Sequence, residues 1–198
     1  MQNKTLFMMR HGQTEWNVTG KLNSTTDIGL SQQGREAVMA LQEPFAHLQI
    51  DRVFASPLRR AVETANLAVP GCQLETDARL VEVDFGPFEG KAPGDFAGTP
   101  LDEAFRQWRL EENPVIPEDA EDFEQAAQRA QAFLDDIQQF EGATLIVSHG
   151  VFLRVLLCCN ILGMPAAYYR RLRLDNGRIV EVQWENDLIR LTRFNASL

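Results

Sequence analysis

The 198-residue sequence predicts an α/β fold, a three-layer α/β/α sandwich with a mostly parallel central sheet. Short apolar runs at 4–9, 51–56 and 143–148 are typical of buried strands, and stretches with helical spacing of apolar residues lie between and after them. Beyond residue 168 the apolar and polar residues alternate, which indicates a short antiparallel meander. The length suits one sizeable core, so we expect one domain over 1–198.

The first half of the chain contains two predicted strand–helix pairs. Ser31 is a suitable N-cap and predicts a helix over 30–48 after the first strand. Ser56 as the N-cap and Pro57 as the first helical residue predict the start of a second helix, because proline loses no helical hydrogen bond at that position. Both helices belong to the layers that cover the sheet.

The second half is predicted to leave the sheet and then return to it. A third strand is expected at 79–86, where apolar residues end in Gly86 and Pro87. The following segment is rich in Pro and Gly, and we interpret it as a small cap inserted at about 91–122.

The chain is then expected to complete the sandwich. An amphipathic pattern predicts a helix over 121–140, and a mostly apolar helix is expected over 149–163. In the meander, Asn176-Gly177 is a typical hairpin turn, and a second turn is expected near 185–187.

Composition and charge argue against several functional classes. The formal net charge of −9 disfavours a nucleic-acid surface or a polybasic membrane anchor, while clustered arginines can still form an anion pocket. No apolar run approaches the length of a membrane span. Cys72, Cys158 and Cys159 are too few and too odd in number for a disulfide framework. We expect a cytoplasmic protein, a monomer or homodimer, with no nucleic-acid or membrane partner.

Two of the three histidines follow predicted strands. His11 and His149 each stand at a strand end, and each precedes a glycine, Gly12 or Gly150. Sites in such sheets form beyond the carboxyl ends of strands, and glycine permits close approach of the backbone to a ligand. One such histidine is usually structural, whereas the pair indicates a functional site. His47 lies near the polar end of a predicted helix and is interpreted as a surface residue.

Arginines beside these histidines indicate a phosphate pocket. Arg10 adjoins His11, and Arg60 lies in the first turn of a predicted helix, whose N-terminus itself favours anions. The guanidinium group matches phosphate oxygens in a bidentate geometry. Of the neighbours Arg59 and Arg60, one is expected to lie on a solvated helix face.

Glu82 is the candidate general acid. It stands among apolar residues on the predicted third strand, where a carboxyl group can supply a proton to a leaving oxygen. The alternative, an outward-facing side chain on a half-exposed strand, stays open.

Other types of site have little support. The sequence contains no P-loop, no G-x-G-x-x-G and no Cys/His spacing typical of a metal site. Neither strand-end histidine has a second histidine at i+4, so we expect no metal ligands. A serine nucleophile elbow is also absent.

Four motifs resemble the histidine phosphatase superfamily, which includes the cofactor-dependent phosphoglycerate mutases. They are "RHGQTEWN", "SPLRRAVETA", "LVEVDFGPFEG" and "IVSHGVFLRVLL", in the order seen in that family and over essentially the whole chain. The resemblance implies a phosphoglycerate mutase-like fold. It also implies phosphoryl transfer to a histidine, without metal or dissociable cofactor because arginines supply the positive charge.

The resemblance further implies roles for individual residues. His11 would be the nucleophile that forms a phosphohistidine, and Glu82 would protonate the leaving oxygen and then accept a proton from water. Arg10, Arg60 and His149 would bind the transferring phosphoryl group. The family pattern places the pocket arginine before Ala-x-x-Thr-Ala, which selects Arg60 over Arg59. Further phosphate-binding positions are Gly12, Gln13, Asn17 and Gly150.

The resemblance covers both phosphatases and mutases, which differ in what removes the phosphoryl group from the histidine. The family's mutases have a long insertion after the "EG" motif, whereas the segment from about Lys91 to Phe123 is short here and rich in acidic residues. An acidic rim does not suit a doubly phosphorylated intermediate, so we favour a phosphatase. The mutase remains the alternative. A phospho-ligand binding protein without turnover is a weaker one, since none of the expected catalytic residues is missing.

Two segments depart from the family pattern. Asn23-Ser24 stands where the family often has Gln-Gly, and "PEDAEDF" replaces the usual Gly-Gly-Glu-Ser before the long helix. Both regions face the substrate in relatives, so the substrate does not transfer with the resemblance. A small phosphate ester is the expected partner, with α-ribazole phosphate or a sugar phosphate as candidates.

Overall fold

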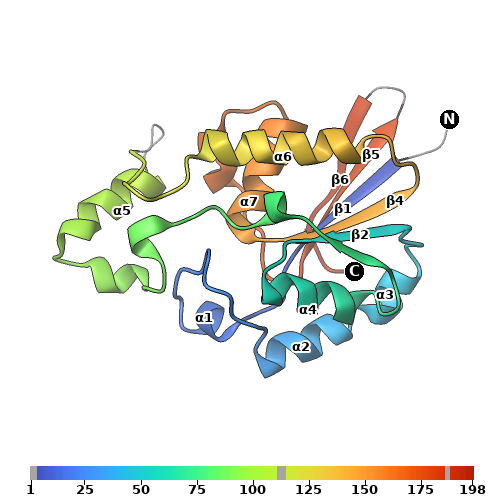
Figure 1. Ribbon diagram of the computed structural model, residues 1–198, viewed down its shortest axis with the longest axis horizontal. Coiled ribbons are helices and arrows are strands. Elements are labelled where there is room, and N and C mark those ends of the chain that lie inside the picture. The colour runs from blue at the N-terminus through green and yellow to red at the C-terminus, as the bar shows by residue number, and fades with distance from the viewer. Residues whose placement is uncertain (1–3, 111–114, 186–187) are drawn as a thin grey trace.

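The computed structural model describes residues 4–110, 115–185 and 188–198 (Figure 1). One six-stranded sheet has the order β3-β2-β4-β1-β5-β6. β1 pairs in parallel with β4, and β2 pairs in parallel with both β4 and β3, while β5 and β6 are antiparallel. The strands are β1 Lys4–Arg10, β2 Arg52–Ala55, β3 Leu74–Thr76, β4 Ala143–Ser148, β5 Ile179–Glu185 and β6 Leu188–Ala196. The predicted α/β fold with a mostly parallel sheet is confirmed.

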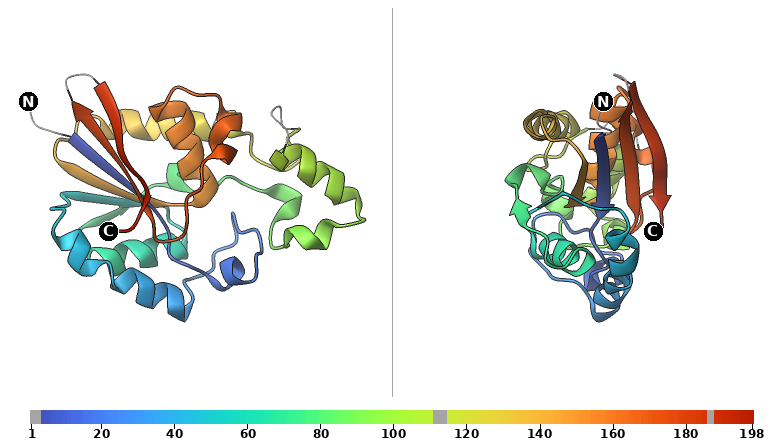
Figure 2. Two further views of the ribbon diagram at one scale, coloured as in Figure 1. Left: turned by 180° about the vertical axis from the view of Figure 1, so that it is seen from behind. Right: turned by 90° about the vertical axis from the view of Figure 1, so that its right-hand side faces the viewer.

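Helices cover both faces of the sheet (Figures 1 and 2). Successive side chains of a strand point to opposite faces, so β1 contributes to two cores: Leu6 and Met8 belong to one, Phe7 and Met9 to the other. The first core packs against α6 and α7, and the second against α2, α3 and α4. These helices are α2 Gln32–Met39, α3 Gln42–Ala46, α4 Arg59–Ala68, α6 Phe123–Ile137 and α7 Gly150–Leu156; the short α1, Glu15–Val18, follows β1.

The segment between Gly86 and α6 forms a cap beside the main body. It contains two 3-10 turns, Gly86–Phe88 and Pro93–Phe96, and the helix α5, Pro100–Leu110. In Figures 1 and 2, α5 lies at the far end of the molecule from the C-terminal strands. Rings of this segment pack on one another and on α6, with Trp108 stacked 6.0 Å from Phe123. The cap therefore shares an aromatic core with the main body rather than hanging from it.

The predicted helix over 30–48 is divided into α2 and α3. Ser31 is the N-cap of α2, since its side chain accepts a hydrogen bond from the Gly34 N–H at 3.0 Å. A continuous helix would place Pro44 in its interior, where proline lacks the N–H and clashes with the preceding turn. In the structure Pro44 instead lies in α3, which restarts after Leu41.

The predicted N-cap of the next helix is wrong. α4 begins at Arg59 with Leu58 as its N-cap, two residues later than expected. The Ser56 hydroxyl does not cap the helix. It contacts the His149 ring and accepts a 3.3 Å hydrogen bond from the Leu58 N–H.

The predicted third strand at 79–86 is also wrong, so Glu82 lies on a loop. Ala78–Leu80 forms a 3-10 turn, and the sheet's edge strand is β3, which ends before it. Arg129 on α6 donates to the carbonyls of Arg79 and Val81 at 2.5 and 2.8 Å. The Arg129 side chain therefore provides hydrogen-bond donors for backbone carbonyls that would pair with a neighbouring strand if this segment were part of the sheet.

The C-terminal meander contains one hairpin rather than two. Asn176-Gly177 forms a turn before β5, but residues 172–175 are not a strand, so the turn joins no strand pair. β5 and β6 pair antiparallel from Glu185 and Leu188 inward. The second predicted turn, at 185–187, includes Asn186 and Asp187, which lie outside the described residues. No helix in the described ranges is long and apolar enough to span a membrane.

Candidate active site

The two strand-end histidines lie side by side. β1 and β4 are parallel neighbours with Arg10 opposite Ser148, so the residues that follow them meet at one edge of the sheet. The His11 N–H donates to the Ser148 carbonyl at 2.9 Å. The centroids of the His11 and His149 rings are 5.2 Å apart. The parallel topology therefore creates the pair that the sequence suggested.

The His11 ring is oriented by its own turn. Nδ1 lies 2.7 Å from the Gly12 carbonyl, which can only accept, so Nδ1 carries the proton and Nε2 keeps its lone pair. The side chain is 3% exposed. Burial, then the charges of Arg60 and Arg10, holds the pKa of His11 well below its usual value. His11 is thus neutral at physiological pH, with a nucleophilic nitrogen.

Arg60 is fully buried and connects three parts of the site. Nη2 and Nη1 donate to the carbonyls of Ser24 and Thr26 at 2.7 and 2.9 Å, and Nε donates to His149 Nδ1 at 3.2 Å. Its neighbour Arg59 has a side chain 62% exposed and pairs with Glu63. Of the two arginines, Arg60 is therefore the one at the site.

His149 is neutral and its tautomer follows from its partners. Because Arg60 is always a donor, Nδ1 must accept, and Nε2–H then donates to the Ser56 hydroxyl at 2.8 Å. Burial, followed by the charge of Arg60, lowers the pKa of His149 well below its ordinary value. The His149 ring is therefore held in one orientation and uncharged beside the His11 ring.

Arg10 retains a donor for a ligand. Its Nη1 donates to the Leu174 carbonyl at 2.7 Å, while its buried Nε has no hydrogen-bond partner among the described residues. Burial lowers the pKa of Arg10 to about 10, so the group remains cationic at neutral pH. A Cβ on Gly150 would lie 3.0 Å from Nε, so the glycine leaves room for this guanidinium.

Glu82 is held at the N-terminus of α7. Oε1 accepts from the N–H groups of Val83 and Phe152 at 3.0 and 2.8 Å, and Oε2 accepts from that of Val151 at 3.0 Å. The side chain is 6% exposed, which resolves the open alternative in favour of an inward-facing carboxyl group. Its position comes from the helix N-terminus and not, as predicted, from a strand.

The loop after His11 is fixed by a capping box on α1. Asn17 Oδ1 accepts from the Thr14 N–H and hydroxyl, both at 3.1 Å, and from Asn176 Nδ2 at 3.2 Å. This leaves the Asn17 amide N–H groups for the cavity. Asn176 also donates to the His11 carbonyl at 3.0 Å, so the Asn-Gly turn supports the nucleophile loop instead of a hairpin.

Gly12 and Gln13 face away from the reacting groups. A Cβ on Gly12 would lie 2.6 Å from Val38 Cγ2, so this glycine allows close packing on α2 rather than approach to a ligand. Its N–H donates to the Thr64 hydroxyl at 2.9 Å, and the Gln13 carbonyl accepts from Ser31. Gly12 and Gln13 both line a separate pocket beside α2.

A cavity of about 360 Å³ opens above these groups. Of the predicted site residues, it is lined by Arg10, His11, Asn17, Glu82 and Gly150. Arg60 and His149 are not among the lining residues, and they support the lining residues from within. The structure therefore assembles most predicted positions around one cavity and leaves Gly12 and Gln13 outside it.

Several lining residues were not identified from the sequence. Arg154 and Arg109 line the cavity, as does Asn23, whose buried amide atoms have no partner among the described residues. Thr64 does not line the cavity, but its hydroxyl accepts a hydrogen bond from the Gly12 N–H. It could have been identified from the sequence, because it follows Arg60 by four residues and so lies on the same helix face. Arg154 had no such signal, because it interrupts an otherwise apolar helix pattern.

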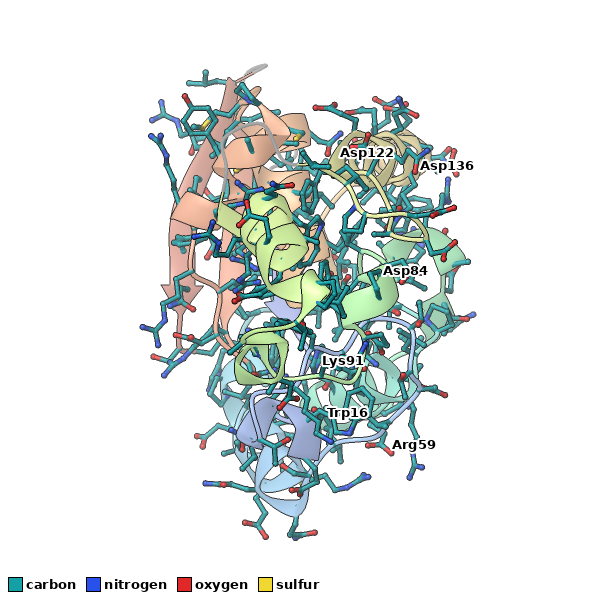
Figure 3. All side chains as sticks on the ribbon, turned by 90° about the vertical axis from the view of Figure 1, so that its left-hand side faces the viewer. Trp16, Arg59, Asp84, Lys91, Asp122 and Asp136 are labelled. Carbon is teal, nitrogen blue, oxygen red and sulfur yellow. The ribbon has the colours of Figure 1, made fainter. Side chains whose placement is uncertain are left out.

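The acidic character of the cap does not extend to the cavity. None of the described acidic residues of 91–122 lines it, whereas Arg109 of the same segment does. The acidic-rim argument for a phosphatase therefore finds no support in the geometry. The base of the cap is tied to the nucleophile loop by reciprocal backbone bonds of 2.9 Å between Leu22 and Gly90–Lys91. Trp16 packs beside Gly90, on the side of the molecule where Figure 3 shows Trp16 and Lys91.

Within the described ranges, no group of three or more His, Cys, Asp or Glu side chains could hold a metal ion. The positive charge next to the paired histidines comes from the guanidinium groups of Arg10 and Arg60. The chemistry that this arrangement supports is attack by a neutral imidazole on an anionic centre.

Comparison with known proteins identifies the family. The sequence model of the histidine phosphatase superfamily (branch 1) matches residues 6–197, and the chain belongs to this superfamily. A Proteus mirabilis protein provisionally named phosphoglycerate mutase GpmB is 32% identical over 187 residues, covering 91% of this chain and 85% of that protein. A Hydrogenobacter thermophilus protein with the provisional name phosphoserine phosphatase 2 is 32% identical over 201 residues, covering 97% of this chain and 95% of that protein.

Among solved structures, the α-ribazole phosphatase from Shigella flexneri has a TM-score of 0.86 at 27% identity and covers 97% of this chain and 96% of its own. The predicted family and its fold are thereby confirmed. The names of these relatives include both phosphatases and a mutase.

Proposed function

We propose that the protein is a metal-independent phosphomonoester hydrolase that acts through a phosphohistidine at His11 on a small phosphorylated metabolite. The observation that carries the proposal is the His11 ring. Its Nδ1 is bonded to the Gly12 carbonyl at 2.7 Å and its pKa is strongly lowered, so Nε2 keeps a lone pair beside Arg10 in the cavity.

The first half-reaction transfers the phosphoryl group to the protein. His11 Nε2 attacks phosphorus, an N–P bond forms and the ester P–O bond breaks. Glu82 acts as the general acid and gives a proton to the leaving oxygen, becoming a carboxylate. The Nε–H of Arg10 and the amide of Asn17 bind the equatorial phosphoryl oxygens, which carry most of the developing charge.

The second half-reaction restores the protein. The Glu82 carboxylate takes a proton from water, the water oxygen bonds to phosphorus and the N–P bond breaks, so inorganic phosphate leaves and His11 regains its lone pair. Arg60 acts in both halves through its charge and by orienting His149, since its nitrogens are bonded to Ser24, Thr26 and His149.

Two features bear on the substrate. One similar solved structure is the α-ribazole phosphatase of Shigella flexneri, and one relative is named a phosphoserine phosphatase. Small phosphate esters, including α-ribazole phosphate and sugar phosphates, are therefore the first candidate substrates. A mutase is the second candidate function, because arginines line the cavity and another relative is named a phosphoglycerate mutase. A mutase would return the phosphoryl group to a retained product instead of to water.

The test is phosphate release from a generic phosphomonoester in the presence of EDTA. The hydrolase is expected to release phosphate, His11→Ala to abolish release, and the exposed-residue control His47→Ala to leave it unchanged. Release that persists in His11→Ala contradicts the proposed nucleophile. Interconversion of phosphoglycerates that depends on bisphosphoglycerate supports the mutase, and ligand binding without release supports a binding protein.

A further inference from the structure

The cavity holds more positive charge than one phosphoryl group requires. Arg10 at the end of β1 is followed along the wall by Arg154 on α7 and Arg109 on α5. Burial is the main cause that lowers the pKa of Arg10 and of Arg154; the charge of Arg154 lowers the former further, and the charge of Arg109 the latter. The three cations therefore form a series from the sheet to the cap, with α7 between β1 and α5 in Figure 1.

Arg154 is fixed in place but not neutralised. Its Nε donates to the Gly150 carbonyl at 2.7 Å and its Nη1 to the Leu172 carbonyl at 3.1 Å, and its guanidinium lies 5.1 Å from the Tyr169 ring centroid. Within the described part of the chain, its Nη2 donates no hydrogen bond and the side chain forms no ion pair. A guanidinium group that is held in place, and whose Nη2 can still donate hydrogen bonds, is well suited to bind an anion.

Arg109 meets the cavity from the last turn of α5. Its guanidinium lies 6.0 Å from the Phe105 ring, and across the described ranges it has neither a hydrogen bond nor an ion pair. The acidic residues of the wall are already engaged: Asp175 pairs with Arg173 at 3.0 Å and with Asn195, and Glu82 caps α7. Arg109 and Arg154 therefore repel each other, and among the described residues neither forms an ion pair with these acids.

We propose that Arg109 and Arg154 form a second anion subsite, and that the substrate is a phosphate monoester carrying a further anionic group, a carboxylate or a second phosphate. An anion bound between the two guanidinium groups removes their repulsion and bonds to Nη2 of Arg154. The proposal rests on the proposed function of the same cavity, where His11 and Arg10 take the transferred phosphoryl group.

Matched esters test the subsite directly. O-phosphoserine and O-phosphoethanolamine differ only in the carboxylate, and propane-1,3-diol bisphosphate and its monophosphate differ only in the second phosphate. We expect kcat/KM to be about 10- to 100-fold higher for the more anionic member of each pair, because a hydrogen bond between charged groups has a free energy that corresponds to this ratio. The pair with the larger ratio identifies whether a carboxylate or a phosphate is preferred.

Variants assign the preference to residues. Arg109→Gln and Arg154→Gln are expected to reduce the ratio within each pair to about 1–3. Arg106→Gln is the matched control, because Arg106 lies on the same helix with an exposed side chain that pairs with Glu103. Arg109→Gln remains decisive if Arg154→Gln does not fold, since among the described residues Arg109 forms no hydrogen bond or ion pair that the substitution would remove.

Binding to the His11→Ala variant separates this proposal from the hydrolase. Calorimetric titration with the same esters needs no turnover. Preferential binding of the more anionic ester without wild-type hydrolysis sustains the subsite and contradicts the hydrolase. Hydrolysis with equal rates and affinities for both members of each pair overturns the subsite and leaves the hydrolase intact. Absence of both hydrolysis and preference overturns both.

Discussion

The floor of the cavity, meaning His11 and Glu82 together with the buried Arg60 and His149 that support them from beneath, is built differently from its wall, which includes Asn23, Arg109 and Arg154. On the floor, Arg60 and His149 are fully buried, and the hydrogen bonds of each side chain go to other protein groups. On the wall, Arg109 and Asn23 lack such partners within the described residues. Groups that carry the reaction are fixed by the fold, whereas groups that meet the rest of the substrate keep their hydrogen-bonding capacity for it.

This difference indicates how the fold divides chemistry from specificity. The floor combines residues from β1, α4, β4 and the Glu82 loop, so a change there disturbs several elements at once. The wall receives Arg109 from the cap, whose aromatic core keeps it in place without contributing to the sheet. Substitutions on the floor are therefore expected to affect catalysis or stability strongly, and those on the cap to affect substrate choice.

The largest effect is expected for His11→Ala. Removing Nε2 removes the atom that accepts the phosphoryl group, so kcat should fall by at least about 1,000-fold. Steady-state phosphate release measures the change, and thermal unfolding verifies that the variant is folded. A variant that keeps more than a tenth of wild-type kcat would place the nucleophile elsewhere on the floor.

Glu82→Gln is expected to lower kcat by about 100- to 10,000-fold, the usual contribution of general acid–base catalysis. The loss should be larger for an alkyl phosphate than for p-nitrophenyl phosphate, whose leaving group needs little protonation. Glu36→Gln on the exposed face of α2 is the control. Equal losses for both esters would mean that Glu82 acts only by capping α7.

Arg60→Ala is expected to destabilise the fold as well as abolish activity. The carbonyls of Ser24 and Thr26 and the His149 ring would lose their donor, at a cost of about 3 kcal/mol in the free energy of unfolding. Arg59→Ala is the matched control: its exposed pair with Glu63 should have no measurable effect. Denaturant titration measures the free energy of unfolding of both variants. Equal values would contradict a structural role of Arg60 in the floor of the cavity.

The buried histidines should make stability depend on pH. The pKa values of His11 and His149 are lowered in the folded protein, so both rings are neutral there and become protonated on unfolding below about pH 6.5. Their contribution is complete above that pH and decreases as the pH falls toward their folded pKa values, by at most about 1.4 kcal/mol per pH unit for each ring.

Denaturant titrations between pH 7.5 and 5 measure this slope. His149→Gln should reduce it, because one of the two buried rings is then absent. For the same reason the acid limb of kcat/KM should lie below pH 6.5, because neutral His11 is the reactive form. A stability that is flat across this range would contradict neutral, buried histidines.

The smallest effect is expected on the acidic side of the cap. Glu103 is exposed on α5, pairs with Arg106 and does not line the cavity. Glu103→Gln should therefore change kcat/KM for any ester by less than about twofold. A larger change would mean that acids of the cap do influence the substrate, as the sequence had suggested.

The sequence predicts those parts of the molecule that depend on local patterns. Strands β1 and β4 and helix α6 have continuous apolar or amphipathic patterns that set their burial, and the order of the parallel strands then brings His11 and His149 together. The same patterns misassigned the Glu82 segment, because Arg129, about 50 residues further on, satisfies its backbone. The division of α2 from α3 was readable from Pro44.

The wall was not predictable in this way. Arg154 gains its orientation from the Leu172 carbonyl, and Arg109 reaches the cavity only because the aromatic rings of the cap pack on α6. Neither contact leaves a local signal in the sequence. The acidic composition of 91–122 pointed in the opposite direction, since composition does not show which side of α5 faces the cavity.

In the proposed mechanism, His11 carries the phosphoryl group during turnover. Rapid-quench mixing with a phosphate ester, followed by mass spectrometry of peptides kept at alkaline pH, tests it most directly. We predict an acid-labile phosphate on the peptide that contains His11, formed at least as fast as kcat and absent from His11→Ala. Phosphate release with no phosphorylated peptide, or with the label on another residue, would contradict His11 as the nucleophile.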